Sequence, residues 1–204
     1  MTQVLLATRN GKKLAELRRI LGDQVTVLGL ADVPEFPEEP ETGATFEENA
    51  VAKAAQAAAA TGEISLADDS GLAVDALNGM PGVLSARWAG KHGDDPANNA
   101  LLLAQLGDVP EERRGAAFVC ALALAVPGAE PVVRRGEWRG RIVREAFGGN
   151  GFGYDPLFVP AESDLAGDGR TSAQLDPAEK DVLSHRGLAL AVMLPDLRLA
   201  LGLG

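Results

Sequence analysis

Short apolar runs alternate with helical patterns along this chain, and this alternation limits the fold more than any other feature of the sequence. Residues 3–8 and 25–28 have the composition of buried strands, and residues 12–21 place leucines on one helical face. Thr45–Glu48 matches a capping box and opens an alanine-rich helix that runs to about Thr61. Strands that alternate with helices predict an α/β protein.

The middle of the chain adds further strands to this pattern. We expect two short strands, residues 64–68 and 72–74, on either side of a turn at Asp69–Gly71. The apolar run 116–126 is followed by a turn and by a second strand, 132–138, which together predict a hairpin. A hairpin beside the alternating elements makes a mixed sheet the expected arrangement.

Helices and one loop complete the expected architecture. Asp95, followed by Pro96, is expected to cap a helix that ends at Gly107. A glycine-rich loop covers residues 148–155, and Asp176 begins the C-terminal helices. We therefore expect one domain, residues 1–204, with two lobes on a long mixed β-sheet flanked by helices.

Charge and cysteine content exclude several classes of protein. The chain has 204 residues and a formal net charge of −10, whereas a protein that coats nucleic acid needs a basic face. Cys120 is the only cysteine, so an intramolecular disulfide is excluded and a reducing compartment is favoured. The N-terminal apolar stretch is too short for a signal peptide or a membrane span. We expect a soluble cytoplasmic protein with no nucleic-acid polymer and no membrane as partner.

The first candidate site lies where the first expected strand meets the first expected helix. Free N–H groups at a helix N-terminus, together with the helix dipole, attract phosphate, and lysines add charge. The alternative is that Thr8 or Asn10 only caps the helix while the lysines face solvent. The candidate phosphate contacts are Thr8, Arg9, Asn10, Gly11, Lys12 and Lys13.

A second candidate site is a group of carboxylates, Glu41 with Asp68 and Asp69, beside Ser70. Carboxylate oxygens suit a hard cation such as Mg²⁺, which could polarise a phosphoryl group and orient water. Adjacent strand residues point to opposite faces, so Asp68 and Asp69 are not expected to share one role. The alternative is an ordinary turn, in which Asp, Ser and Gly are common.

Two aromatic residues, Phe152 and Tyr154, lie in the glycine-rich loop. Glycines let the backbone approach a ligand closely, and either aromatic ring could stack on a base. The spacing of the glycines does not match the dinucleotide-binding fingerprint. A flexible hairpin loop without a ligand is the alternative interpretation.

Basic residues near the C-terminus and in the alanine-rich helix form the last candidate group. Lys180 could reach a phosphate, and His185 with Arg186 could donate hydrogen bonds to carbonyl oxygens of a base. Lys53 shares a helix face with Asn49 at i,i+4 spacing. The alternative for each of these residues is a solvated helix face.

Taken together, five segments resemble one family, the inosine triphosphate pyrophosphatases, also called XTP/dITP diphosphatases. They occur in the family's order and span Ala7 to Leu190. The matching segments are ATRNGKKLAEL, ETGATFEENAVAKA, ADDSGLAVDALNGMPGVLSAR, GFGYDPLF and EKDVLSHRGLAL. Agreement in five separate segments favours the functional interpretations over the separate alternatives.

The resemblance implies a fold, an activity and a cofactor. Members of this family have two lobes on a long mixed sheet, bind the nucleotide in the cleft between them, and are typically homodimers. The implied activity is Mg²⁺-dependent hydrolysis of ITP, dITP and XTP to the nucleoside monophosphate and pyrophosphate, which cleanses the nucleotide pool.

The resemblance also implies a role for each matching residue. Asp69 would activate the attacking water and, with Glu41, hold Mg²⁺. Residues 8–13 would hold the triphosphate, mainly through Asn10 and Lys13. The other implied substrate contacts, to phosphate, base or sugar, are Lys53, Ser70, Phe152, Gly153, Tyr154, Asp155, Lys180, His185 and Arg186.

The sequence departs from the family pattern at Arg9, where glycine is common, so Arg9 either adds a phosphate contact or faces solvent. Four other functions stay open at this point. They are a related pyrophosphatase for modified pyrimidines or dTTP, a nucleotide sensor without catalysis, a structural or interaction protein, and a phosphatase that releases orthophosphate.

Overall fold

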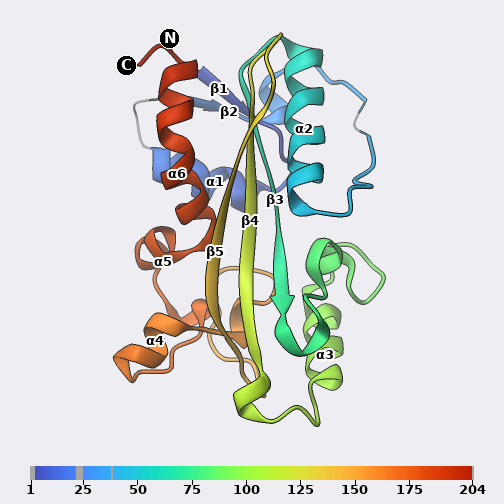
Figure 1. Cartoon of the computed structure of the whole chain (residues 1–204), viewed down its shortest axis with the longest axis vertical. Coiled ribbons are helices and arrows are strands. Elements are labelled where there is room, and N and C mark those ends of the chain that lie inside the picture. Colours follow the sequence, from blue (N-terminus) through green and yellow to red (C-terminus); the bar gives the residue numbers. More distant parts are fainter. Residues whose placement is uncertain (1–2, 22–24, 38, 204) are drawn as a thin grey trace. The chain divides into compact units, whose positions relative to one another are not determined.

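The computed structural model describes residues 3–21, 25–37 and 39–203 of the chain (Figure 1). In these residues six strands form one sheet in the order β2-β1-β3-β4-β5-β6. The strands are β1 (Gln3–Leu6), β2 (Thr26–Leu28), β3 (Ser65–Val74), β4 (Gly115–Ala125), β5 (Val132–Ile142) and β6 (Phe158–Pro160). β1 is parallel to β2 and β3, whereas β5 and β6 are antiparallel. The prediction of an α/β protein with a mixed sheet is therefore confirmed.

Helices flank the strands, as expected. They are α1 (Gly11–Leu21), α2 (Phe46–Thr61), α3 (Asp95–Gln105), α4 (Ala161–Ala166), α5 (Pro177–Leu183) and α6 (His185–Ala200), with short 3₁₀ turns between them. None of the helices in the described residues is long and apolar enough to cross a membrane.

The chain folds into two compact units, and the first contains both chain ends. It comprises residues up to Asp69, Cys120–Gly136 and the chain from Arg186 onward. Helices α1 and α6 bury Leu17 and Met193 against strand residues such as Leu66. Helix α2 lies on the other side of these strands (Figure 1). Its buried alanines have small side chains, so its backbone can lie close to the sheet.

The second unit comprises Ser70–Val119 and Glu137–His185, and its core is rich in aromatic rings. Phe118 packs edge-on against Phe158 with ring centroids 4.7 Å apart, and Trp138 lies 5.4 Å from Phe158. Leu102 and Leu106 are fully buried against this cluster. The core therefore forms between helix α3 and the strand segments of this unit.

One predicted turn is wrong, because residues 69–71 lie inside a strand. The two short strands predicted around them are a single strand, β3, which is buried along most of its length. Gly71 is required by packing: a Cβ there would lie 2.6 Å from the carbonyl oxygen of Gly82. Close approach of another backbone is a common reason for glycine inside a strand. Here the glycine follows Asp and Ser, so the local composition is also typical of a turn.

The hairpin and most helix boundaries agree with prediction. β4 and β5 are neighbours in the sheet, and β5 is longer than expected. Thr45 caps α2 by accepting a hydrogen bond from the Glu48 N–H at 3.1 Å. The capping box is incomplete, however, because the Glu48 carboxylate accepts instead from the N–H of Ala44.

The predicted cap of α3 is displaced by one residue. Asp94, not Asp95, accepts from the Ala97 N–H and caps the helix. Asp95 instead accepts from the N–H of Gly153, at 2.8 Å, and so holds the glycine-rich loop. The C-terminal helices begin at Asp176 as predicted, and its side chain caps α5.

Candidate active site

The first unit gathers a group of charged side chains from four elements and the loop before α2, which we call the charged cluster. Its members are Lys13 of α1, Glu41, Lys53 of α2, Asp68 and Asp69 of β3, and Arg186 of α6. These residues are far apart in the sequence, and the parallel strands of this unit and their flanking helices bring them together. The two adjacent aspartates divide the cluster, as the alternation of side chains along a strand predicts.

Asp68 faces the N-terminal ends of α1 and α6. Its Oδ2 atom lies 2.9 Å from Lys13 Nζ and 3.1 Å from a terminal nitrogen of Arg186. The Asp68 and Arg186 side chains are almost fully buried, at 2% and 3% exposure. One carboxylate thus joins two cations from different helices.

Asp69 faces α2. Asn49 donates to its Oδ2 atom at 2.9 Å, and Lys53 Nζ lies 3.6 Å from its Oδ1 atom. The Lys53 ammonium also donates to Glu41, at 2.8 Å, and to the backbone carbonyl of Asp68. Asn49 and Lys53 therefore share a helix face, as their spacing predicts, and both serve Asp69.

The surroundings of the two aspartates shift their pKa values in opposite directions. Burial alone would raise the pKa of Asp68, but the charges of Lys13, Arg186 and Lys53 outweigh it and lower the pKa well below its usual range. Burial raises the pKa of Asp69, and the Lys53 charge and the Asn49 hydrogen bond only partly oppose this rise. Asp68 is thus held as an anion, whereas the raised pKa of Asp69 makes it the better proton acceptor of the two.

The phosphate-loop candidate forms the strand-to-helix turn that the sequence predicts. Asn10 Oδ1 accepts from the Lys13 N–H at 3.3 Å, and Thr8 Oγ1 accepts from the Asn10 N–H at 3.2 Å. The capping role of Asn10 is therefore present, and it orders the start of α1. The side chain of Lys12 lies outside the described residues.

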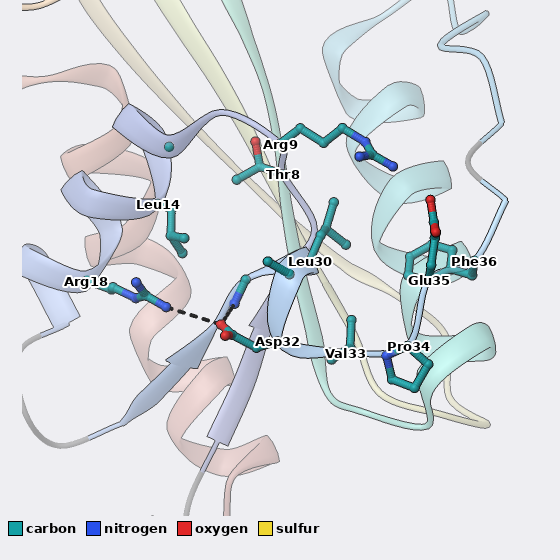
Figure 2. Close-up of a pocket in the computed structure, with 13 residues that line it drawn as sticks. Thr8, Arg9, Leu14, Arg18, Leu30, Asp32, Val33, Pro34, Glu35 and Phe36 are labelled. Carbon is teal, nitrogen blue, oxygen red and sulfur yellow. Dashed lines mark hydrogen bonds and ion pairs between the residues drawn. The ribbon is translucent and has the colours of Figure 1, made fainter.

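Arg9 is exposed and borders a cavity of about 610 Å³ (Figure 2). The cavity lies between α1 and the chain from Gly29 to Phe36, and Thr8 and Gly11 form part of its wall. Figure 2 shows the Arg9 side chain extending toward Glu35 and Phe36. Arg9 thus lies at a cavity that begins at the candidate phosphate loop.

The second unit holds the glycine-rich loop around a buried carboxylate, Asp155. It forms an ion pair with Lys180 at 2.5 Å, and accepts from Ser172 Oγ at 2.7 Å and from the Phe152 N–H at 2.8 Å. Gly151 has a positive φ of 79°, and a Cβ there would overlap the Asp155 carboxylate. The loop is therefore held by a hydrogen bond within it and by contacts to Ser172 and Lys180, in contrast to the flexible loop of the alternative interpretation.

The two aromatic residues of this loop have different surroundings. Tyr154 is buried at 4% exposure and donates from its hydroxyl to the carbonyl of Ser85 at 2.8 Å. Phe152 is half-buried, and Lys180 Nζ lies 5.5 Å from its ring centroid. Phe152 is thus the aromatic side chain with a partly exposed face for a base.

The remaining predicted contacts lie in the same unit. His185 stacks on Phe118, with centroids 5.0 Å apart and planes inclined by 16°. Gly153 is fixed by Asp95 and by the side-chain amide of Asn99, which donates to its carbonyl. Ser70 is half-buried on β3.

Glu41 and Asp69 are two carboxylates whose oxygen atoms could hold a divalent metal ion. Within the described residues no three His, Cys, Asp or Glu side chains cluster as a metal cage would require. Mg²⁺, however, is commonly held by one or two carboxylates with phosphate oxygens and water. Both carboxylates already approach one cation, Lys53, so their placement fits a positive ion.

Comparison with known proteins assigns the chain to a family. The model of the Ham1 family matches residues 4–196. The chain belongs to the Ham1 family. This match, together with relatives named dITP/XTP pyrophosphatase, confirms the resemblance inferred from the five sequence segments.

The relatives of this Ham1-family protein match nearly its whole length. Proteins named dITP/XTP pyrophosphatase from Nocardia farcinica and Mycobacterium tuberculosis are 66% and 64% identical, covering 97% of this chain and 95% and 96% of theirs. A crystal structure of the Mycobacterium abscessus nucleoside-triphosphatase, or dITP/XTP pyrophosphatase, is 61% identical. It covers 95% of this chain and 99% of that chain, with a TM-score of 0.77. The Ham1 protein of Staphylococcus aureus, 40% identical over 96% of this chain and 97% of that chain, has a TM-score of 0.83.

Two residues of this Ham1-family site, Asn49 and Asp68, were singled out in the sequence, but the contacts that they make were not predicted. Asn49 binds Asp69, and Asp68 binds Lys13 and Arg186. Strand alternation and the i,i+4 spacing to Lys53 were the sequence signals for them, but neither signal reveals a partner from a distant segment.

Proposed function

We propose that this Ham1-family enzyme hydrolyses non-standard purine nucleoside triphosphates, ITP, dITP and XTP, to the monophosphate and pyrophosphate with Mg²⁺. The enzyme class, a nucleoside triphosphate pyrophosphatase, is confirmed by relatives that match nearly the full length. The observation that carries the proposal is Asp69, a buried carboxylate with a raised pKa beside Glu41 and Lys53.

The chain's own residues supply a base and positive charge for this reaction. Asp69 takes a proton from water, which attacks the α-phosphorus in line, and pyrophosphate leaves. Asn49 donates a hydrogen bond to the Asp69 carboxylate and so fixes the orientation in which this carboxylate can accept a proton. Lys13 and Lys53 offset the charge of the triphosphate, and the resemblance alone assigns Lys180 to the phosphates as well. This is positioning with electrostatic stabilisation, as phosphoryl transfer generally requires.

Glu41 and Asp69 would hold the metal together with phosphate oxygens. When bound, Mg²⁺ supplies charge neutralisation on the phosphate groups and helps to orient water. Lys53 Nζ lies 2.8 Å from Glu41 Oε1 and 3.6 Å from Asp69 Oδ1, and its charge is proposed to act on the phosphates as well.

Base selectivity has a physical basis in buried hydrogen-bond donors. Hypoxanthine and xanthine have a 6-oxo group, which can accept from Arg186, a residue only 2% exposed. Adenine presents an amino donor at the same position and would leave a buried donor unpaired, a mismatch that discriminates strongly. His185 and Phe152 are the proposed contacts to the base faces and edges. Homodimer formation is also proposed from the resemblance, and a cytoplasmic location from the single cysteine, which favours a reducing compartment.

Turnover of a nucleotide panel tests this function. We expect pyrophosphate from ITP, dITP and XTP, and at least about a hundredfold lower kcat/KM for ATP and dTTP. Chelation of divalent metal should abolish turnover, and added Mg²⁺ should restore it. Orthophosphate as product would indicate a phosphatase, preference for dTTP a pyrimidine enzyme, and binding without turnover a sensor.

Arg9 permits a test of the departure from the family pattern. Because its side chain is exposed at the cavity wall, Arg9→Gly should raise KM for ITP by only about threefold and leave kcat unchanged. The increase should shrink at high salt, because an exposed charge is screened. A tenfold or larger fall in kcat would instead place Arg9 in contact with the reacting phosphate.

A further inference from the structure

We propose that Asp68 is a positioning residue that holds the side chains of Lys13 and Arg186 in place at the same time. Asp68 would thereby couple phosphate binding to base recognition. The inference rests on the proposed function, which assigns Lys13 to phosphate and Arg186 to the base. Asp68 itself touches neither substrate nor metal in this account, because it faces away from Asp69 along β3.

One carboxylate oxygen atom of Asp68 contacts both cations. Asp68 Oδ2 accepts from Lys13 Nζ at 2.9 Å and from two nitrogens of Arg186 at 3.1 and 3.3 Å. Lys13 comes from the first turn of α1 and Arg186 from the first turn of α6. Because one acceptor serves both, a shift of either cation changes the position that the other prefers.

Burial makes this arrangement rigid. The Asp68 side chain is 2% exposed, Arg186 3% and Lys13 15%, so water competes little for these hydrogen bonds. A buried ionic group of this kind is weak support for stability, because well-packed apolar side chains often serve as well. Its value here lies in holding two long, rotamer-rich side chains in one geometry before substrate binds.

Removal of the Asp68 charge should therefore weaken the binding of the phosphates and the binding of the base at the same time. In Asp68→Asn the amide keeps the shape of the side chain but loses the charge that holds both cations. We expect kcat/KM for ITP to fall about 30-fold or more, with a rise in KM. A purely structural role would lower the amount of active enzyme and leave the KM of the folded fraction unchanged.

Two fragments of the substrate separate the two ends. IMP carries the base without the terminal phosphates, and inorganic tripolyphosphate carries the phosphates without a base. Calorimetry on the full chain should show that Asp68→Asn raises the dissociation constant of IMP and that of tripolyphosphate about tenfold or more. If the affinity for only one probe fell, or for neither, the proposed coupling would be wrong. Asp196→Asn, which removes the 2.9 Å partner of Arg134 in the same unit, is the matched control and should change neither probe.

A double-mutant cycle tests the inference if Asp68→Asn does not fold. Lys13→Met, Arg186→Met and their combination keep Asp68 in place. The loss in kcat/KM for the pair should differ from the product of the single losses by about fivefold or more. Independent, multiplicative losses would overturn the proposal. A wild-type enzyme that releases no pyrophosphate from ITP would refute the proposed function, whereas the calorimetric probes would still report on the coupling.

Discussion

Asp69→Asn should reduce the turnover of ITP about a thousandfold, the usual contribution of a positioned general base. The amide has nearly the shape of the carboxylate, but it cannot take a proton from water. It also removes one of the two negative charges that Lys53 now approaches and that a metal would need. Both losses act on the chemical step, so kcat should fall far more than KM rises.

The measurement is steady-state kinetics with thermal melting of the same preparations. Asp69→Asn should melt within a few degrees of the wild type, since Asn49 can still bond to the amide oxygen. Asp75→Asn is the matched control: its partner is Arg139, and both side chains are about half exposed. It should retain wild-type turnover. Near-normal turnover in Asp69→Asn would show that another residue activates the water.

Arg114→Met should lower the free energy of unfolding by about 3–5 kcal/mol, because it removes the partner of several buried carbonyl groups. Arg114 is 1% exposed and donates to the backbone carbonyls of Leu106, Ile142 and Val143 at 2.6 to 2.9 Å. It therefore ties the end of α3 to the end of β5. Methionine fills a similar volume but leaves these carbonyls without a donor.

Arg144→Met is the comparison that isolates burial. Arg144 donates to the carbonyls of Gly107 and Val109 nearby, but its side chain is 53% exposed. Water can replace those bonds, so the loss should stay below about 1 kcal/mol. Urea denaturation of both variants measures the difference. Equal losses, or a loss below 1 kcal/mol for Arg114→Met, would contradict the role assigned to its buried hydrogen bonds.

Periodicity predicted the elements of this fold better than the details at their ends. The strand pattern of β1, the leucine face of α1 and the alanine-rich α2 depend on local sequence, and each was predicted correctly. The turn at residues 69–71 was wrong because Gly71 serves packing against Gly82, a contact that no local pattern reveals. The buried hydrogen bonds of Arg114 could not be predicted for the same reason, since its carbonyl partners lie up to 29 residues away.

The candidate site shows the same division between local and distant information. Strand alternation correctly separated Asp68 from Asp69, and helical spacing correctly paired Asn49 with Lys53. The binding of Lys13 and Arg186 by Asp68 joins residues up to 118 positions apart, so it required the tertiary structure. Tyr154 and Phe152 are equivalent candidates in the sequence. The structure distinguishes them by burial, because Tyr154 is part of the core whereas Phe152 is partly exposed.

Hydrolysis of ITP in ¹⁸O-labelled water tests the central claim most directly, because it reports which phosphorus the water attacks. Attack at the α-phosphorus breaks its bond to the bridging oxygen, places the label in IMP and leaves pyrophosphate unlabelled. We predict label in IMP alone. Label in pyrophosphate would place the attack at the β-phosphorus, and labelled orthophosphate would place it at the γ-phosphorus; either result would contradict the account.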